Sequence, residues 1–253
     1  MTRRCVSSAI FASCRPAVLL IACVASAGAH EPVLLDPNRA TPGVRVQLVP
    51  ASADSNPDLA LGYRVVARGF PPGITFSVWT KHFGHAFHEA ASGFHVDAAG
   101  KLVSTEPDAF NRPQYLDDML FQPEAYPRGA NWQVAVASSD LTIAGFATVI
   151  PRPITASDGP CVVSLELVSH RGERFLASAI GFTPGDDVIV ESRYSGRVSR
   201  KQRTASDAGV LPPDVIWHAS PGDDRSARYS VKGRYCEVAL DYEWGKPALL
   251  GQK

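Results

Sequence analysis

The sequence predicts an all-β protein whose mature part consists of two tandem β-sandwich domains. After residue 30, short β-rich runs are broken by glycine, proline, aspartate and serine, and no convincing long helical pattern appears. The 20 glycines and 20 prolines follow no fixed period, which favours frequent turns. A turn motif of the first half returns 112 residues later, which indicates that one module is duplicated.

The composition supports folded cores and argues against a general nucleic-acid binder. The chain has 253 residues, 45% of them hydrophobic, which is enough for one or two buried cores. Its 25 Lys and Arg residues balance its 25 Asp and Glu residues, whereas a nucleic-acid binder shows a basic excess.

Residues 1–29 are expected to be a cleaved signal peptide. Three arginines and no acidic residue accompany a short apolar run at 17–25, and Ala27-Gly28-Ala29 fits the cleavage rule for a cut before His30. A cut after Ala27 is one alternative. A second alternative is lipidation at Cys23, since Leu20-Ile21-Ala22-Cys23 resembles a bacterial lipobox, and the lipid would anchor the chain to a membrane.

Cleavage before His30 would leave 22 basic and 25 acidic residues, a formal charge of −3, in a periplasmic or secreted protein. The apolar run is too short to cross a bilayer, which needs about 20 residues, and no later segment is apolar enough to do so. The mature chain is therefore expected to have no transmembrane segment.

The repeated turn has a local physical basis. Gly69-Phe70-Pro71-Pro72-Gly73 corresponds to Gly181-Phe182-Thr183-Pro184-Gly185, and each copy lies between two strand-like runs. Proline presets φ, glycine permits positive φ, and the phenylalanine can pack beneath the turn. Two further echoes follow in the same order: residues 97–102 with 207–211, and residues 128–136 with 232–240.

These motifs resemble the immunoglobulin-like repeats of exported bacterial proteins, many of which are uncharacterised. The resemblance covers most of residues 60–140 and 172–245, and it implies a fold but no catalytic residues. We expect a first immunoglobulin-like sandwich with an N-terminal lead-in at 30–150, a Pro-bounded linker at 151–160, and a second sandwich at 161–253. A lead-in strand is expected at 44–49, and an irregular insert at 108–127 with a helical turn near 116–121.

Cys161 and Cys236 remain after signal cleavage, and an even pair in an exported protein predicts a disulfide. We place them in the first and last strands of the second sandwich, both on apolar faces. Two buried free thiols are the alternative, and a nucleophilic cysteine does not suit these inward positions.

A histidine-rich stretch is the sharpest chemical signal. Imidazoles are common ligands of copper and zinc, but the spacing matches no zinc-finger or H-E-x-x-H pattern. An ordinary loop that caps the sandwich edge is the alternative. His30 could join the cluster, because an N-terminal histidine chelates through its amine and a ring nitrogen, as in copper-binding β-sandwich proteins. The candidate metal ligands are His30, His82, His85, His88 and His95.

A basic stretch and the four tryptophans each admit more than one interpretation. A basic stretch on an expected hairpin is either a charged, solvated edge or a contact for anionic glycans or lipid head groups. The four tryptophans are expected to pack in the core or at edges rather than to form a sugar platform. The residues of the basic stretch are Arg193, Arg197, Arg200, Lys201 and Arg203.

The sequence thus favours a non-enzymatic, exported cell-envelope protein with a binding or structural role and no cofactor. Its partner would be an envelope protein or a glycan, with no nucleic acid involved. The rival hypothesis is a periplasmic copper or zinc protein that uses the histidine cluster. A hydrolase or oxygenase is the remaining alternative, although no catalytic arrangement is recognisable.

Overall fold

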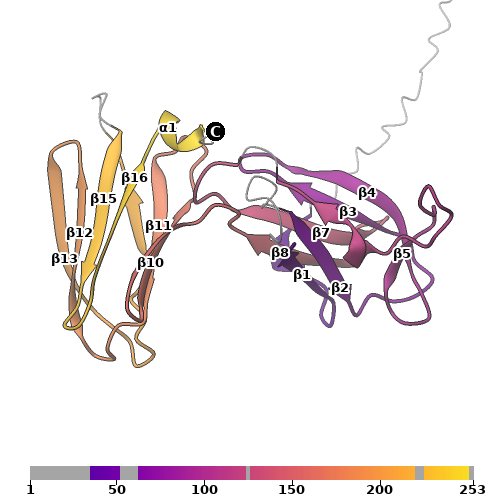
Figure 1. Cartoon of the computed structure of the whole chain (residues 1–253), viewed down its shortest axis with the longest axis horizontal. Coiled ribbons are helices and arrows are strands. Elements are labelled where there is room, and N and C mark those ends of the chain that lie inside the picture. The colour runs from indigo at the N-terminus through magenta and orange to yellow at the C-terminus, as the bar shows by residue number, and fades with distance from the viewer. Residues whose placement is uncertain (1–34, 52–61, 124–125, 220–224, 251–253) are drawn as a thin grey trace, which may run out of the picture. The chain divides into compact units, whose positions relative to one another are not determined.

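The computed structural model describes residues 35–51, 62–123, 126–219 and 225–250 (Figure 1). The predicted signal peptide and His30 lie outside this part of the chain. The described residues form four antiparallel sheets and only three short helical turns. The turns are η1 (Pro37–Arg39), η3 (Leu116–Asp118) and α1 (Lys246–Leu249). No helix in the described ranges has the length and apolar character that a membrane crossing needs.

The first sandwich contains one sheet of three strands and one of five. The smaller sheet has the order β1 (Arg45–Pro50), β2 (Tyr63–Arg68), β6 (Leu120–Phe121). The larger has the order β5 (Leu102–Ser104), β4 (Phe87–Val96), β3 (Phe76–Lys81), β7 (Trp132–Ser138), β8 (Ala144–Val149). Strand β1 and helical turn η3 confirm the lead-in strand and the turn within the insert.

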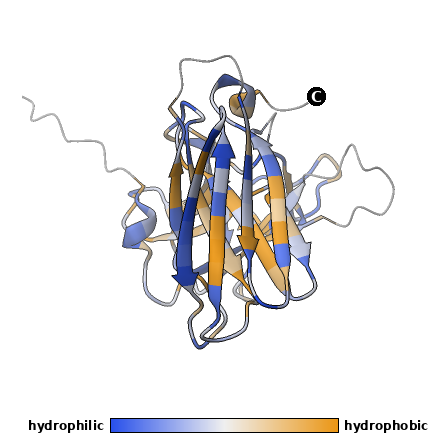
Figure 2. Ribbon diagram, turned by 90° about the vertical axis from the view of Figure 1, so that its left-hand side faces the viewer, coloured by the Kyte–Doolittle hydropathy of each residue, from blue (hydrophilic) through white to orange (hydrophobic). Residues whose placement is uncertain are grey.

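The second sandwich contains two sheets of four strands. One has the order β14 (Asp214–Trp217), β11 (Arg174–Ile180), β10 (Cys161–Leu167), β9 (Ile154–Asp158). The other has the order β13 (Arg197–Thr204), β12 (Asp187–Tyr194), β15 (Ser226–Lys232), β16 (Glu237–Glu243). Orange and blue bands alternate along strands in Figure 2, because one face of each ribbon is buried.

The two sandwiches share one strand order, which supports duplication of a module. The order β1-β2-β6 matches β10-β11-β14, and β4-β3-β7-β8 matches β13-β12-β15-β16. Strand β5 extends the first module and β9 extends the second. The prediction of an all-β fold with two sandwiches is therefore confirmed.

The G-F-x-P-G turns occupy equivalent places, after β2 and after β11. Gly69 and Gly181 have φ of +79° and +82°. A Cβ on Gly69 would lie 2.2 Å from the Gly43 carbonyl oxygen, and one on Gly181 would lie 1.9 Å from that of Pro160. Phe70 and Phe182 are buried beneath the turns, as predicted. The first position of the G-F-x-P-G turn needs glycine for two reasons: its φ is positive, and another segment of backbone approaches it too closely for a Cβ.

The second echo is real, but its residues align differently from the sequence prediction. The amide of Asp97 donates to the carbonyl of Lys101, and that of Ser206 donates to the carbonyl of Val210. The side chains of Asp97 and Ser206 also make equivalent hydrogen bonds. Asp97 Oδ1 accepts from Lys101 N at 2.8 Å, and Ser206 Oγ accepts from Val210 N at 3.2 Å. Asp97 therefore corresponds to Ser206 rather than to Asp207.

The third echo is a coincidence of local sequence. Trp132 begins β7, whose counterpart by strand order is β15. Cys236 precedes β16, whose counterpart is β8. The two segments look alike because each is a glycine turn followed by alternating apolar residues, a pattern that any strand with one buried face produces.

The expected linker at 151–160 needs correction, because it contains strand β9. This strand pairs with β10 through the register Val163↔Ala156 and Leu165↔Ile154, and Ile154 is buried. Pro151 and Pro153 precede the strand, where proline interrupts no ladder hydrogen bond. Cys161 accordingly opens the second strand of this sheet, not the first. The division of the chain into two separate domains stays a prediction.

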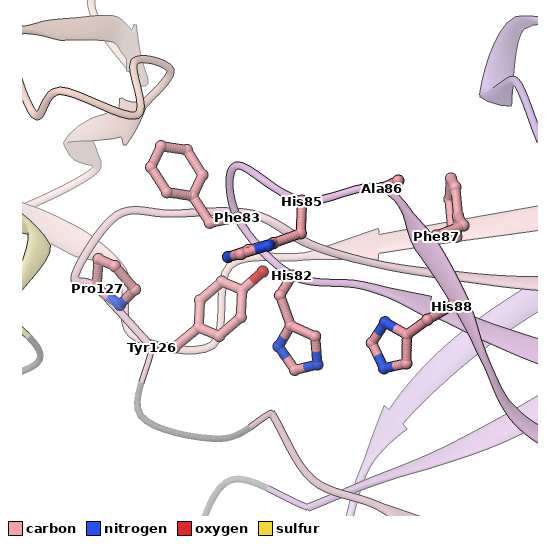
Figure 3. A pocket seen from close by; sticks show the side chains of 8 residues that line it. All are labelled: His82, Phe83, His85, Ala86, Phe87, His88, Tyr126 and Pro127. Atoms are coloured by element: carbon pink, nitrogen blue, oxygen red, sulfur yellow. The ribbon is translucent and has the colours of Figure 1, made fainter.

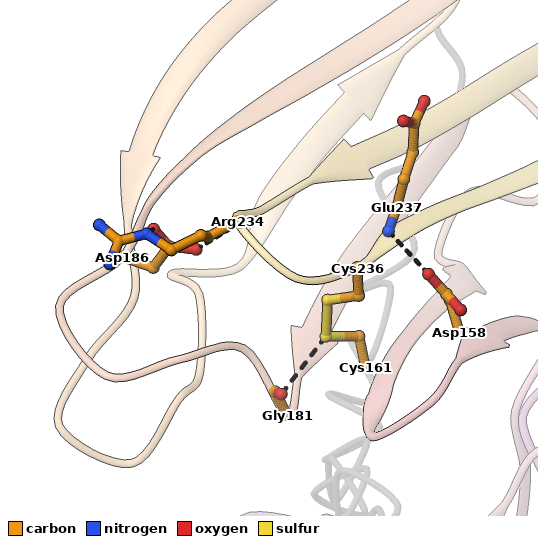
Figure 4. The surroundings of a disulfide bond; sticks show 7 residues. All are labelled: Asp158, Cys161, Gly181, Asp186, Arg234, Cys236 and Glu237. Carbon is orange, nitrogen blue, oxygen red and sulfur yellow. Dashed lines mark hydrogen bonds and ion pairs between the residues drawn. A yellow bond between two sulfur atoms is a disulfide. The ribbon is translucent and has the colours of Figure 1, made fainter.

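The predicted disulfide between Cys161 and Cys236 is present, with a Cα–Cα distance of 6.4 Å (Figure 4). It joins the start of β10 to the residue before β16, and these strands belong to different sheets. Cys161 Sγ also lies 3.3 Å from the Gly181 carbonyl oxygen, and the oxidised sulfur has no proton to donate there. The bridge therefore links the two sheets at a point next to the repeated turn.

Candidate functional site

An open depression of about 670 Å³ lies where β3 ends and β4 begins (Figure 3). Three of the five predicted histidine ligands line it, together with aromatic side chains. The segment between the strands turns at Gly84, which has φ of +78°. The lining residues are His82, Phe83, His85, Ala86, Phe87, His88, Tyr126 and Pro127.

The rings of His82 and His88 stack with their centroids 5.0 Å apart and an interplanar angle of 11°. The stacking follows from register, because Thr80 pairs with His88 across β3 and β4, and His82 lies two residues beyond Thr80. Thr80 Oγ1 and His88 Nε2 share a hydrogen bond of 3.0 Å, which orients the second ring. His82 and His88 therefore lie on the same face of the hairpin formed by β3 and β4.

Tyr126 forms the buried wall of the depression. Its hydroxyl donates to the Asn131 carbonyl oxygen at 2.8 Å, and its ring centroid lies 6.0 Å from that of His82. Burial raises the pKa of the Tyr126 hydroxyl to about 12, so the group remains protonated at physiological pH. Tyr126 thus supports the imidazole pair rather than acting as a base.

The remaining predicted ligands do not all converge. His85 lines the depression and is exposed, whereas His95 lies seven residues beyond His88 on β4, opposite Val103. Within the described ranges, no group of three or more His, Cys, Asp or Glu side chains is arranged to hold a metal ion. Among the described histidines of the predicted cluster, His82 and His88 are the pair whose rings stack.

No sequence pattern singled out His218, yet it is the most deeply buried polar side chain of the second sandwich. It is 0% exposed, and its Nε2 shares a 2.7 Å hydrogen bond with the Tyr242 hydroxyl. The rings of Phe175, Tyr194 and Trp244 surround it. Desolvation lowers the pKa of His218 to about 4, which keeps the imidazole neutral. An isolated histidine after a short strand carries no signal of such burial.

The basic stretch forms the predicted hairpin of β12 and β13, and part of its charge is neutralised. Glu191 forms ion pairs with Arg193 and Arg200, the latter at 2.6 Å. Hydrogen bonds from Arg200 and Arg193 lower the pKa of the Glu191 carboxyl. Lys201 pairs with Asp214 at 3.0 Å. Trp132 and Trp244 are buried as expected, whereas Trp217 on β14 is exposed.

The fold and the depression define a disulfide-linked β-sandwich protein with an open site at strand ends. No protein-family model matches the chain, and no curated protein does. Among solved structures, a tetra-tandem repeat in the extending region of a large adhesion protein is similar at 13% identity and a TM-score of 0.24. The match covers 79% of this chain and 48% of that one, so this chain spans about half of its length.

Proposed function

We propose that this chain is an exported, non-enzymatic protein of the cell envelope that binds an envelope protein or a glycan. The Cys161–Cys236 disulfide supports export, the first part of the proposal, because structural disulfides persist in oxidising compartments outside the cytosol. The depression supports the second part. The depression is open and two of its imidazoles, those of His85 and His88, are exposed, and a site that excludes water poorly favours binding over catalysis.

The proposal predicts that the protein binds to the cell envelope and that the depression is the binding site. Purified mature protein would be incubated with isolated sacculi and with envelope vesicles, and the sedimenting fraction measured. We expect His85→Ala combined with Phe87→Ser to lower that fraction several-fold, while His95→Ala, an exposed histidine further along β4, leaves it unchanged. Equal sedimentation of all three proteins contradicts binding at this site. A turnover activity abolished by one polar substitution would overturn the non-enzymatic role.

A second candidate function, copper or zinc binding, is favoured by one observation, the stacked pair of His82 and His88. Two imidazoles supply half of a four-coordinate site. The other ligands would come from solvent or from His30, which the described residues do not include. The test is a calorimetric titration with Cu²⁺ and with Zn²⁺, in which His88→Ala should weaken binding at least about tenfold, or 1.4 kcal/mol. Unchanged affinity in His82→Ala and His88→Ala excludes the pair.

A further inference from the structure

A groove of about 260 Å³ lies between two edge strands of the second sandwich. Strand β14 ends one sheet and β13 ends the other, so neither has a second strand neighbour in the described part of the chain. Inward side chains of β12 form the floor of the groove. The lining residues are Val190, Ser192, Tyr194, Ser199, Lys201, Asp214, Val215, Ile216 and Trp217.

The free edge of β14 presents backbone donors and acceptors. The His218 amide donates to the Glu173 carbonyl at 2.9 Å, just beyond the register pair Trp217↔Arg174. In an antiparallel pair, hydrogen-bonded and non-hydrogen-bonded positions alternate. The N–H and C=O groups of Val215 and Trp217 therefore point away from β11, toward the open edge. Unpaired edge groups of this kind form a template for an added strand.

The outer face of β14 is apolar and unusually exposed. Val215 is 61% exposed and Trp217 is 60% exposed. The guanidinium carbon of Arg174 lies 5.6 Å from the centroid of the Trp217 ring. In a strand added beside β14, every second side chain would lie on this outer face and would contact Val215 and Trp217, since alternate residues of a strand share one face.

Strand β13 carries cationic residues on the face that it turns toward the groove. The register of β13 places Arg197, Ser199, Lys201 and Arg203 on the face toward the groove, and the middle two line it. The facing carboxylate is Asp214, paired with Lys201 across the gap, and Glu173 lies beyond the other end of β14. On this face the three cations of β13 stand against one carboxylate, Asp214, which leaves an excess of positive charge and favours an anionic occupant.

We propose that β14 accepts an extended acidic peptide as an added strand. Its alternate side chains would be acidic toward β13 and apolar toward Val215 and Trp217. The backbone edge supplies affinity, and the two differently lined faces supply specificity. The proposed site is independent of the histidine depression, because it lies on different strands and is tested with different variants.

The probe is a blocked hexapeptide of alternating glutamate and valine, with binding followed by calorimetry and by tryptophan fluorescence. We expect saturable binding that weakens with added salt. The same peptide with lysine in place of glutamate should not bind. Two N-methylated versions test strand addition, because methyl groups on the amides facing β14 should abolish binding and those on the other amides should not.

Matched charge reversals test the location. Lys201→Glu should weaken binding about tenfold or more, whereas Lys232→Glu, another exposed lysine paired with a carboxylate, should change it little. Dichroism checks that both variants fold. The proposal is overturned by absence of binding at millimolar peptide, by equal affinity of both N-methylated peptides, or by equal effects of the two reversals. Sedimentation showing that β14 is covered by a second copy of the chain would also overturn it.

Discussion

His218 is the residue whose protonation matters most for this fold. Its imidazole is enclosed by aromatic rings, and its Nδ1 has no hydrogen-bond partner among the described protein atoms. A charge on this ring would be buried without a compensating carboxylate, which is costly. The sandwich therefore depends on the neutral form.

The free energy of unfolding should fall as the pH falls from about 6.5 to about 4. Unfolded histidine has a pKa near 6.5, whereas the pKa of His218 in the fold is about 4, so the unfolded state binds the proton first. The contribution is fully present above pH 6.5 and amounts to roughly 3 kcal/mol. Urea denaturation across this range measures it. His218→Gln should flatten the profile, and an unchanged profile would refute the assignment.

Gly181 and Gly185 allow steric contact to be separated from backbone strain within one turn. Both have positive φ, but a Cβ would clash with the Pro160 carbonyl only at Gly181, and meets nothing within 4 Å at Gly185. Gly185→Ala should cost about 1 kcal/mol of stability, and Gly181→Ala clearly more. Chemical denaturation of both variants tests the order, and equal losses would show that the contact relaxes freely.

At the scale of elements, the disulfide connects the two sheets of the second sandwich. It spans 75 residues of sequence, and the chain-entropy model assigns about 4 kcal/mol to closing such a loop. Replacing Cys161 and Cys236 together with alanine should lower the free energy of unfolding by an amount of that order. Oxidised wild type is the reference in guanidinium titrations. Labelling of both thiols in unfolded, unreduced protein would contradict the bridge.

At the scale of the whole molecule, export remains a prediction from the first 29 residues. The exported protein should begin at His30, and mass spectrometry of material from the periplasm or medium measures its N-terminus. A start at Gly28 removes the terminal imidazole and weakens the copper hypothesis. An acylated Cys23 would replace both forms by a membrane-anchored one.

The fold was largely predictable, because alternation and turn chemistry are local. Phe70 and Phe182 could be placed beneath their turns from the motif alone, and β1 and η3 from their composition. Strand β9 was missed, because its short, polar run lies between prolines and only pairing with β10 reveals it. The false correspondence between Trp132 and Cys236 arose because any strand with one buried face shows the same alternation of apolar residues.

The candidate sites were less predictable, because they depend on which strands become neighbours. His82, His85 and His88 could be grouped from their spacing, but the exclusion of His95 and the stacking of one pair required the register of β3 and β4. The groove at β14 and the burial of His218 arise from residues that are adjacent only across the sandwich.

The sequence alone therefore determined the all-β class, the repeated turn, the disulfide partners and the basic hairpin. Each depends on residues close together in the sequence, or on the only two cysteines outside the predicted signal peptide. Tertiary structure decided which histidines meet, which imidazole is buried and which strand edges stay open. These depend on pairing between distant segments, where burial and long-range packing select one register among several that local propensity permits.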